Sequence, residues 1–195
     1  MSRAPSRPGP PAGPGGRTTP LSESRPMAYA EIPETDARAP ALDRIDRKIL
    51  HELQRDCSLS LARLADRVGL SQTPCWKRIR RLEQSGVITG RVALVDPARI
   101  GLGLTVFVEI EAPDHGPGWR ARFAEAVAAL PEVVEVWRMA GEVDYLLKVV
   151  TADMPAFDAF YLRLTETTGP KNVTSKFAME RIRDTTVYPV NTTDP

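Results

Sequence analysis

Apolar residues between positions 43 and 84 recur at the spacing of three and four residues that marks one face of an α-helix. Three stripes follow one another: Ile45, Ile49, Leu50 and Leu53; Leu61, Leu64, Ala65 and Val68; and Cys75, Ile79 and Leu82. A residue that favours a helix N-cap precedes each stripe, namely Asp43, Ser60 and Ser71. The pattern therefore predicts three short helices, each with an apolar face that must pack against other parts of the chain.

A tight turn joins the second and third of these predicted helices. Gly69 accepts the positive φ that the end of a helix often requires, and Pro74 lies in the first turn of the next helix, where its missing N–H is not needed. Two helices joined in this way form the helix-turn-helix arrangement, in which the last helix reads DNA. Residues 87–95 follow, and we expect them to form two short strands of a wing.

The side of the third helix opposite its apolar stripe carries amide, hydroxyl, aromatic and cationic groups. Such a face makes a poor core and a good nucleic-acid surface. The residues expected to contact DNA are Ser71, Gln72, Thr73, Trp76, Lys77, Arg80 and Arg81. Taken alone, this helix is equally compatible with a charged face that is merely solvated, and the helices before it favour the DNA-binding interpretation.

These residues are expected to play different parts in DNA binding. Groups at the start of the helix donate hydrogen bonds to phosphate, and Gln72 reaches an adenine edge. The three cations clamp phosphates, each adding roughly one unit to the salt dependence of binding. Trp76 either contacts a thymine methyl or sugar edge or packs across a subunit contact. Arg78 lies nearer the helix flank, where it can pair with an internal acid instead, and Arg91 either meets a phosphate or is simply exposed.

Beyond a linker at residues 96–104, the spacing changes to β-branched and aromatic runs that alternate with helical segments. We expect strands at residues 105–111, 133–140, 144–150 and 173–182, and helices at 119–130 and 154–167. This βαββαβ order is that of a ferredoxin-like αβ-sandwich, in which one helical layer covers an antiparallel sheet. The fold class of the whole chain is therefore α+β.

The second face of this predicted sheet needs a cover. The apolar residues that cannot all lie under two helices are Phe107, Val136, Trp137, Phe177 and Met179. A second subunit is the most economical cover for such a surface, so the sequence predicts a dimer at least.

Charge is divided unevenly along the chain, although the net formal charge is only +1. Residues 43–91 hold 11 Lys and Arg against six Asp and Glu, a net of +5, whereas residues 92–195 hold 10 against 15, a net of −5. We expect a basic module for a polyanion joined to an acidic module with another task. Residues 1–41 contain nine of the 18 prolines and no hydrophobic period, which predicts a disordered tail in which Met27 is a second candidate for the start.

Several function classes find no support in the sequence. Cys57 and Cys75 are too few for a disulfide framework, and no Cys/His spacing suggests a metal site. His51 and His115 are isolated, and no catalytic arrangement of side chains appears, so we expect no catalytic residues, no metal and no cofactor. With no secretory signal and no apolar run long enough to cross a membrane, the chain is expected in the reducing cytoplasm, associated with the nucleoid.

Three stretches of the chain resemble the leucine-responsive/asparagine-regulator (Lrp/AsnC) family of bacterial and archaeal transcription factors. They are LDRIDRKIL at 42–50, GLSQTPCWKRIRRLE at 69–83 and GEVDYLLK at 141–148. The resemblance covers residues 42–190. It implies a winged helix-turn-helix domain at 42–95, a linker at 96–104, a ligand-sensing and oligomerisation domain at 105–190, and a C-terminal tail at 191–195.

The resemblance also implies what the protein does. Members of this family bind double-stranded DNA and assemble as dimers and larger oligomers, and many bind an amino acid or related metabolite between dimers, which shifts assembly or DNA affinity. We therefore expect a regulator of amino-acid metabolism or transport genes that forms dimers and octamers and has no membrane partner. Two alternatives stay open: a ligand-independent architectural DNA-binding protein, and a ferredoxin-like metabolic enzyme or enzyme regulatory subunit.

The resemblance implies an effector site at the turn of residues 141–144. Gly141 lets a ligand approach the backbone, exposed backbone groups there suit an α-carboxylate, and Glu142 or Asp144 suits an α-ammonium, with Met139 on the pocket wall. From the spacing alone, an ordinary hairpin with solvated acids is favoured. The family resemblance is what makes these four residues the candidate effector site, together with groups from a neighbouring dimer.

Overall fold

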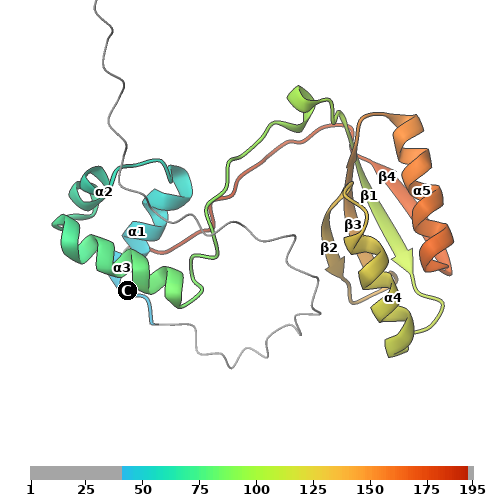
Figure 1. Cartoon of the computed structure of the whole chain (residues 1–195), viewed down its shortest axis with the longest axis horizontal. Helices are drawn as coiled ribbons and strands as arrows, with labels where there is room; N and C mark the ends of the chain where they lie inside the picture. Colours follow the sequence, from blue (N-terminus) through green and yellow to red (C-terminus); the bar gives the residue numbers. More distant parts are fainter. Residues whose placement is uncertain (1–40, 193–195) are drawn as a thin grey trace, which may run out of the picture.

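The computed structural model describes residues 41–192. Three helices form an N-terminal domain, and a four-stranded sheet with two helices forms a C-terminal domain (Figure 1). The predicted tail at 1–41, apart from Ala41, and most of the predicted tail at 191–195 lie outside the described residues. None of the helices in the described part of the chain is long and apolar enough to cross a membrane.

The N-terminal domain consists of α1 (Arg44–Arg55), α2 (Leu61–Val68) and α3 (Gln72–Gln84), as the hydrophobic spacing predicts. Asp43 caps α1 by accepting a hydrogen bond from the Asp46 N–H, and the Asp46 carboxylate accepts one from the Asp43 N–H. This reciprocal pair is a complete capping box. The three helices enclose a single core formed by Ile49, Leu50, Leu64, Ala65, Val68, Cys75, Ile79 and Leu82.

The turn between α2 and α3 sets the position of α3. Ser60 caps α2 by accepting a hydrogen bond from the Arg63 N–H, and Gly69 ends that helix in the left-handed conformation with φ of 73°. A residue with a Cβ would be strained at this φ. The prediction that Gly69 ends the second helix with a positive φ is therefore confirmed. Ser71 occupies the N-cap position of α3 as expected, but its side chain makes no capping hydrogen bond.

The two wing strands expected in residues 87–95 are absent from the structure, so this part of the prediction was wrong. Residues 89–96 have no regular secondary structure. The segment is held near α3 by the Ile88 N–H, which donates to the Leu82 carbonyl at 3.0 Å, and by the ion pair of Arg91 with Glu83 at 3.1 Å. Val92 and Leu94 are exposed. β-branched residues favour extended backbone, but a strand also needs a neighbour for its ladder hydrogen bonds, and no described segment supplies one here.

The C-terminal domain follows the predicted βαββαβ order, after a short 3₁₀-helix, η1 (Pro97–Ile100), in the linker. Its elements are β1 (Leu104–Glu111), α4 (Pro117–Ala128), β2 (Val133–Arg138), β3 (Tyr145–Thr151), α5 (Met154–Thr168) and β4 (Asn172–Phe177). The strands are ordered β2-β3-β1-β4, and each neighbouring pair is antiparallel. Helices α4 and α5 pack against each other beside the sheet (Figure 1).

Strand register decides which apolar residues face the helices. Val136 lies opposite the buried Leu147, and Phe177 lies opposite the buried Val106, so both are on the helix side of the sheet. The Phe177 ring meets the ring of Phe157 from α5 edge to face, with centroids 5.2 Å apart. Of the five apolar residues that the sequence predicts to need a second cover, Val136 and Phe177 therefore face the helical layer, although Phe177 keeps 43% of its surface exposed.

The open face of the sheet is mixed in character. Phe107 and Trp137 are exposed on it, beside the cross-strand ion pairs Glu135–Lys148 at 2.7 Å and Glu109–Lys176 at 2.5 Å. Because β4 ends at Phe177 and not at residue 182, Met179 lies beyond the sheet and is fully exposed. A dimer through this open face stays a prediction.

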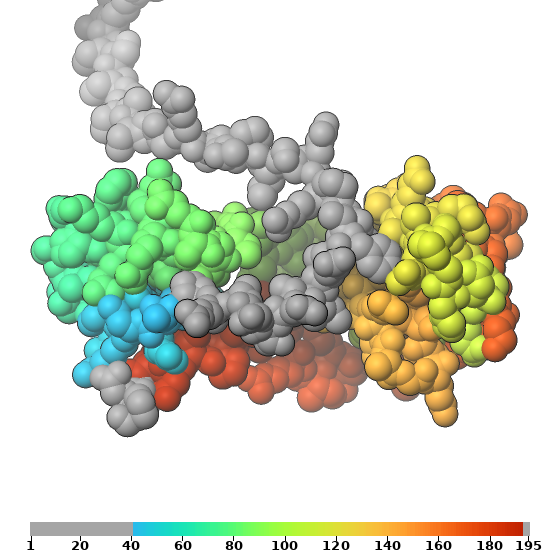
Figure 2. All heavy atoms as spheres, turned by 90° about the horizontal axis from the view of Figure 1, so that it is seen from below, coloured from blue at the N-terminus to red at the C-terminus, as the bar shows by residue number. Residues whose placement is uncertain are grey.

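After β4 the chain returns to the N-terminal domain. Residues 178–192 run beside the linker and reach α1, against which the red C-terminal segment lies in Figure 2. The side-chain amide of Gln54 accepts a hydrogen bond from the Tyr188 N–H at 2.7 Å and donates one to the Tyr188 carbonyl at 3.5 Å. The last described segment of the chain thus contacts its first helix.

Candidate DNA-binding face and effector site

The outward face of α3 is open to solvent along its whole length. The residues of this exposed face are Ser71, Gln72, Thr73, Trp76, Lys77, Arg80 and Arg81. Trp76 exposes 51% of its surface, whereas Cys75 and Leu82 on the opposite side are buried. The helix therefore has the two faces that the sequence predicts, and its polar face, apart from Arg81, is open to a partner.

Trp76 and Arg80 form one unit on this face. The Arg80 guanidinium lies 5.8 Å from the centre of the Trp76 ring, in a cation–π contact. Arg80 also pairs with Glu83 at 3.3 Å, and the other carboxylate oxygen of Glu83 pairs with Arg91 at 3.1 Å. Exposed pairs of this kind contribute little to stability, so a phosphate can replace Glu83 as the partner of either arginine.

The start of α3 offers backbone donors to an anion. Ser71 provides no side-chain cap for this helix end, and Gln72 and Thr73 are exposed beside it. The first N–H groups of a helix and the positive end of its dipole together attract phosphate. The arrangement is compatible with the predicted phosphate and base contacts of these residues.

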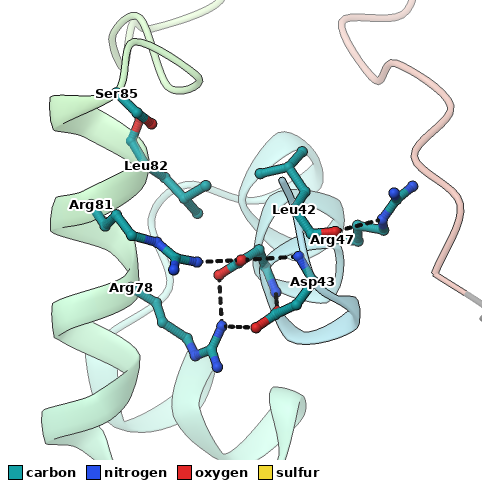
Figure 3. A network of polar contacts seen from close by, with 8 residues as sticks. Leu42, Asp43, Arg47, Arg78, Arg81, Leu82 and Ser85 are labelled. Atoms are coloured by element: carbon teal, nitrogen blue, oxygen red, sulfur yellow. Dashed lines mark hydrogen bonds and ion pairs between the residues drawn. The ribbon is translucent and has the colours of Figure 1, made fainter. Parts of the chain in front are cut away.

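An acid pair at the start of α1 holds two arginines of α3 (Figure 3). Arg78 donates to Asp43 at 2.5 Å and to Asp46 at 2.9 Å, which confirms the predicted alternative that Arg78 pairs with an internal acid. Arg81 also pairs with Asp46, whose carboxylate is fully buried. Arg81, which the sequence assigns to a phosphate, thus already has a partner inside the domain, and its contact with DNA stays a prediction.

Asp43 makes the stability of the N-terminal domain depend on pH. Partial burial acts to raise the pKa of Asp43, but the Asp46 N–H and the Arg78 guanidinium outweigh it and hold this pKa below the ordinary value of 3.8. A carboxyl group whose pKa is lowered by folding stabilises the folded state above its ordinary pKa, and this contribution is lost as the pH falls through the lowered value.

We therefore expect the melting temperature of the N-terminal domain to fall as the pH drops below about 4. Asp43→Asn keeps a good N-cap side chain but cannot titrate. In circular-dichroism melts, the melting temperature of this variant should therefore fall less steeply as the pH is lowered. A melting temperature that fell as steeply as that of the unchanged protein would show that Asp43 does not cause the loss of stability at low pH.

The candidate effector site lies at the turn between β2 and β3, where the backbone is closed by short hydrogen bonds. The Met139 N–H donates to the Asp144 carbonyl at 2.8 Å, and the Asp144 N–H donates to the Ile110 carbonyl at 3.0 Å. Gly141 has φ of 139°, and no atom lies within 4 Å of the place that a Cβ would occupy. Met139 and Glu142 are exposed, so the tip of the turn is open to a ligand.

Asp144 has two neighbours that the sequence does not indicate. One carboxylate oxygen accepts a hydrogen bond from the Ala112 N–H at 2.8 Å, and the other lies 3.4 Å from Nδ1 of His115. Both neighbours come from the loop after β1, which the antiparallel pairing of β1 with β3 brings beside the turn. From the sequence, His115 is expected to be an isolated surface residue. The register of β1 against β3 is the information that would have placed it beside Asp144.

The described residues show no sign of a metal site. No group of three or more His, Cys, Asp or Glu residues is arranged to hold an ion within residues 41–192. Cys57 is exposed and Cys75 is buried, and both are free thiols. Burial raises the pKa of the Cys75 thiol, which keeps this side chain in its neutral form as part of the core.

A helix-turn-helix unit with a polar reader face, joined to a βαββαβ domain with an open turn, defines a class of DNA-binding regulators with a ligand-binding domain. Comparison with family models agrees, because residues 42–89 match the winged helix-turn-helix DNA-binding model and residues 105–188 match the Lrp/AsnC ligand binding domain. The chain belongs to the Lrp/AsnC family of DNA-binding transcriptional regulators.

Individual relatives support this assignment. The chain is 54% identical over 150 residues to the DNA-binding transcriptional activator DecR of Escherichia coli K12, a match that spans 76% of this chain and 99% of that protein. A crystal structure of an AsnC family regulator from Agrobacterium tumefaciens is similar with a TM-score of 0.74 and 52% identity, covering 76% of this chain and 97% of that one. A Neisseria meningitidis regulator in complex with L-methionine has a TM-score of 0.73 and 35% identity, covering 77% and 98%.

Proposed function

We propose that this regulator controls genes of amino-acid metabolism or transport, and that an amino acid or related metabolite bound between dimers changes its oligomeric state or DNA affinity. The observation that carries the proposal is the combination, in one chain, of an exposed reader face on α3 with an open, acid-bearing turn at Met139–Asp144. The complex of the Neisseria relative with L-methionine supports an amino acid as the ligand class. We place this activity in the cytoplasm, on nucleoid DNA.

The DNA-binding part of the proposal uses the exposed face of α3. Ser71, Gln72 and Thr73 meet phosphate and base edges at the start of the helix, while Lys77 and Arg80 neutralise phosphates farther along. Trp76 presents its ring beside the Arg80 guanidinium, where an apolar contact with a thymine methyl or a sugar edge is sterically open. The exposure of all these side chains supports the assignment.

The effector part of the proposal uses the turn after β2. An α-amino acid carries one carboxylate and one ammonium group, which need hydrogen-bond donors and an anionic acceptor at close range. The exposed backbone around Gly141 supplies donors, Asp144 or Glu142 supplies the negative charge, and Met139 supplies an apolar wall. One oxygen of Asp144 is held by the Ala112 N–H, and the other lies 3.4 Å from Nδ1 of His115, so a ligand ammonium would compete with His115 for this second oxygen.

Regulation then follows from linked equilibria. A ligand that bridges two dimers stabilises one assembly over another by its difference in affinity for the two. The assembly fixes how many α3 helices engage spaced DNA sites at once, and each added contact multiplies the overall affinity. A ligand-independent architectural protein would keep the DNA binding and the oligomer but would show no such shift.

Trp76→Ala should weaken binding to a selected DNA site by about tenfold while changing binding to random DNA much less, because a lost base contact typically costs 1–3 kcal/mol. The measurement is fluorescence anisotropy with two labelled duplexes, one enriched by the protein from a random pool and one of random sequence. An equal loss on both duplexes would show that Trp76 adds affinity without specificity.

Binding of the effector should be visible as a thermal shift in a panel of the twenty amino acids at millimolar concentration. A ligand at 100 times its Kd adds about 2.7 kcal/mol to the stability of the state that binds it. Asp144→Asn keeps an oxygen acceptor for the Ala112 N–H but removes the charge, so this variant should lose the shift without losing its fold. The matched control, Asp158→Ala, removes an exposed acid of α5 and should keep the shift.

A flat panel with the unchanged protein would contradict free amino acids as effectors. DNA binding that persisted in that case, with no response to other metabolites, would favour the architectural alternative.

A further inference from the structure

Asp46 is the most unusual charged residue of the N-terminal domain. Its carboxylate is fully buried, yet both oxygens have partners: one accepts from Arg78, and the other accepts from Arg81 and from the Asp43 N–H. A buried carboxylate without partners is strongly unfavourable, so the two arginines are what compensate for the burial of this side chain.

The spacing of the four charged residues joins two helices. Asp43 and Asp46 are the N-cap and third residue of α1, and Arg78 and Arg81 lie one turn apart on the flank of α3. Two acids and two bases one turn apart on facing helices fix both the rotation of α3 about its axis and its position along α1. A shift of α3 in either direction would also leave the buried Asp46 carboxylate with fewer partners, a cost that adds to the cost of disturbing the apolar core.

The charges of this cluster also cancel. Two carboxylates and two guanidinium groups sum to zero, so the cluster offers no net charge to a phosphate. On the outward face the balance is different, because Arg80 and Arg91 share the single carboxylate of Glu83 and leave a net positive charge. Breaking the exposed Arg80–Glu83 pair costs little, whereas withdrawing Arg81 from Asp46 leaves a buried charge with one partner fewer.

We propose that Asp46, together with Asp43, positions the reader helix for DNA, and that Arg78 and Arg81 act as its anchors instead of as phosphate contacts. The proposal deepens the proposed function and rests on α3 being the DNA reader. Arg81 exposes 57% of its side chain, and in the sequence its charge and its place on the third helix are what make it resemble a phosphate clamp. Its pairing with a fully buried acid assigns it the positioning role.

Positioning and phosphate contact predict different salt dependences. We expect Arg81→Gln to leave the slope of log K against log salt unchanged on a random 30-base-pair duplex, and to lower the ratio of affinities for a selected and a random duplex by about tenfold. Arg80→Gln is the matched control on the neighbouring position, and it should lower the slope by about one unit. Arg81→Lys keeps a charged donor for Asp46, so its ratio of affinities for the selected and the random duplex should lie between those of Arg81→Gln and the unchanged protein.

Two further variants separate positioning from mere stability. Arg78→Gln should reproduce the effect of Arg81→Gln, and the double variant should cost less than the sum of the two, because both arginines pair with the carboxylate of Asp46. All affinities are measured at a temperature where circular dichroism shows native helix content for every variant. Asp46→Asn is included only if it passes that criterion.

Distinct results would overturn the proposal. A slope lowered by about one unit in Arg81→Gln, as in Arg80→Gln, would make Arg81 a phosphate contact. An unchanged slope together with an unchanged affinity ratio would reduce the cluster to a stabilising ion pair. If Arg80→Gln also left DNA binding unaltered, α3 would not be the reader, and the proposed DNA-binding face itself would fail.

Discussion

Phe123→Ala should lower the free energy of unfolding of the C-terminal domain by about 3–5 kcal/mol, the cost of deleting a large buried aromatic side chain. Phe123 is almost completely buried on α4, where its ring stacks on Trp119 with centroids 4.9 Å apart and meets Tyr145 at 4.5 Å. The N-terminal core shares no residue with the cluster around Phe123. The melting of the three-helix domain should therefore stay unchanged in this variant.

Differential scanning calorimetry provides the measurement, with Leu64→Ala as the reciprocal control. Leu64 is buried in the core of the three helices, so its truncation should lower only the transition of the N-terminal domain, by about 2–5 kcal/mol. Two separately movable transitions are the expected outcome. A joint shift of both transitions in either variant would show that the two cores unfold as one cooperative unit.

The double variant Lys77→Ala/Arg80→Ala should bind random DNA roughly 50-fold more weakly at 0.1 M salt, because each lost phosphate contact removes about 0.9 from the slope of log K against log salt. Both side chains are exposed on the reader face of α3, and the ion pair that Arg80 makes within residues 41–192 is the exposed one with Glu83. The total drop in slope should approach two units.

A charge-matched control distinguishes this local effect from a general loss of positive charge. Arg99→Ala/Lys171→Ala removes two exposed cations from the linker and the C-terminal domain, and its slope should equal that of the unchanged protein. If the control lowered the slope as much as the double variant on α3, the DNA contact would depend on the overall charge of the molecule and not on the reader helix.

The elements that depend on local interactions were predictable from the sequence. The helical spacing and the caps placed α1, α2 and α3, because a capping box such as that of Asp43 and Asp46 and a left-handed glycine such as Gly69 involve residues within one turn of each other. The order of strands and helices in the second domain was predictable for the same reason. Runs of β-branched and aromatic residues punctuated by Pro and Gly mark element types without reference to the rest of the chain.

What depends on contacts between distant segments was less predictable. The partner of Arg81 is 35 residues away on another helix, and its pairing follows from how α1 and α3 cross, which no local pattern records. The prediction of wing strands was wrong for a related reason, because a strand forms only beside a neighbouring strand that shares its hydrogen bonds. At the candidate effector site, the turn residues were found through the family resemblance, whereas Ala112 and His115 approach Asp144 only because β1 pairs with β3.

Gln54 and Tyr188, which hydrogen-bond to each other, lie 134 residues apart in the sequence, so the order of synthesis decides when this contact can form. On the ribosome, the three helices emerge and can fold while the sheet is still being synthesised, because N-terminal domains generally fold first. Until then, the side-chain amide of Gln54 forms its hydrogen bonds with water. Tyr188 leaves the exit tunnel only after the sheet has been made, so its docking on α1 is among the last events in the maturation of the nascent chain.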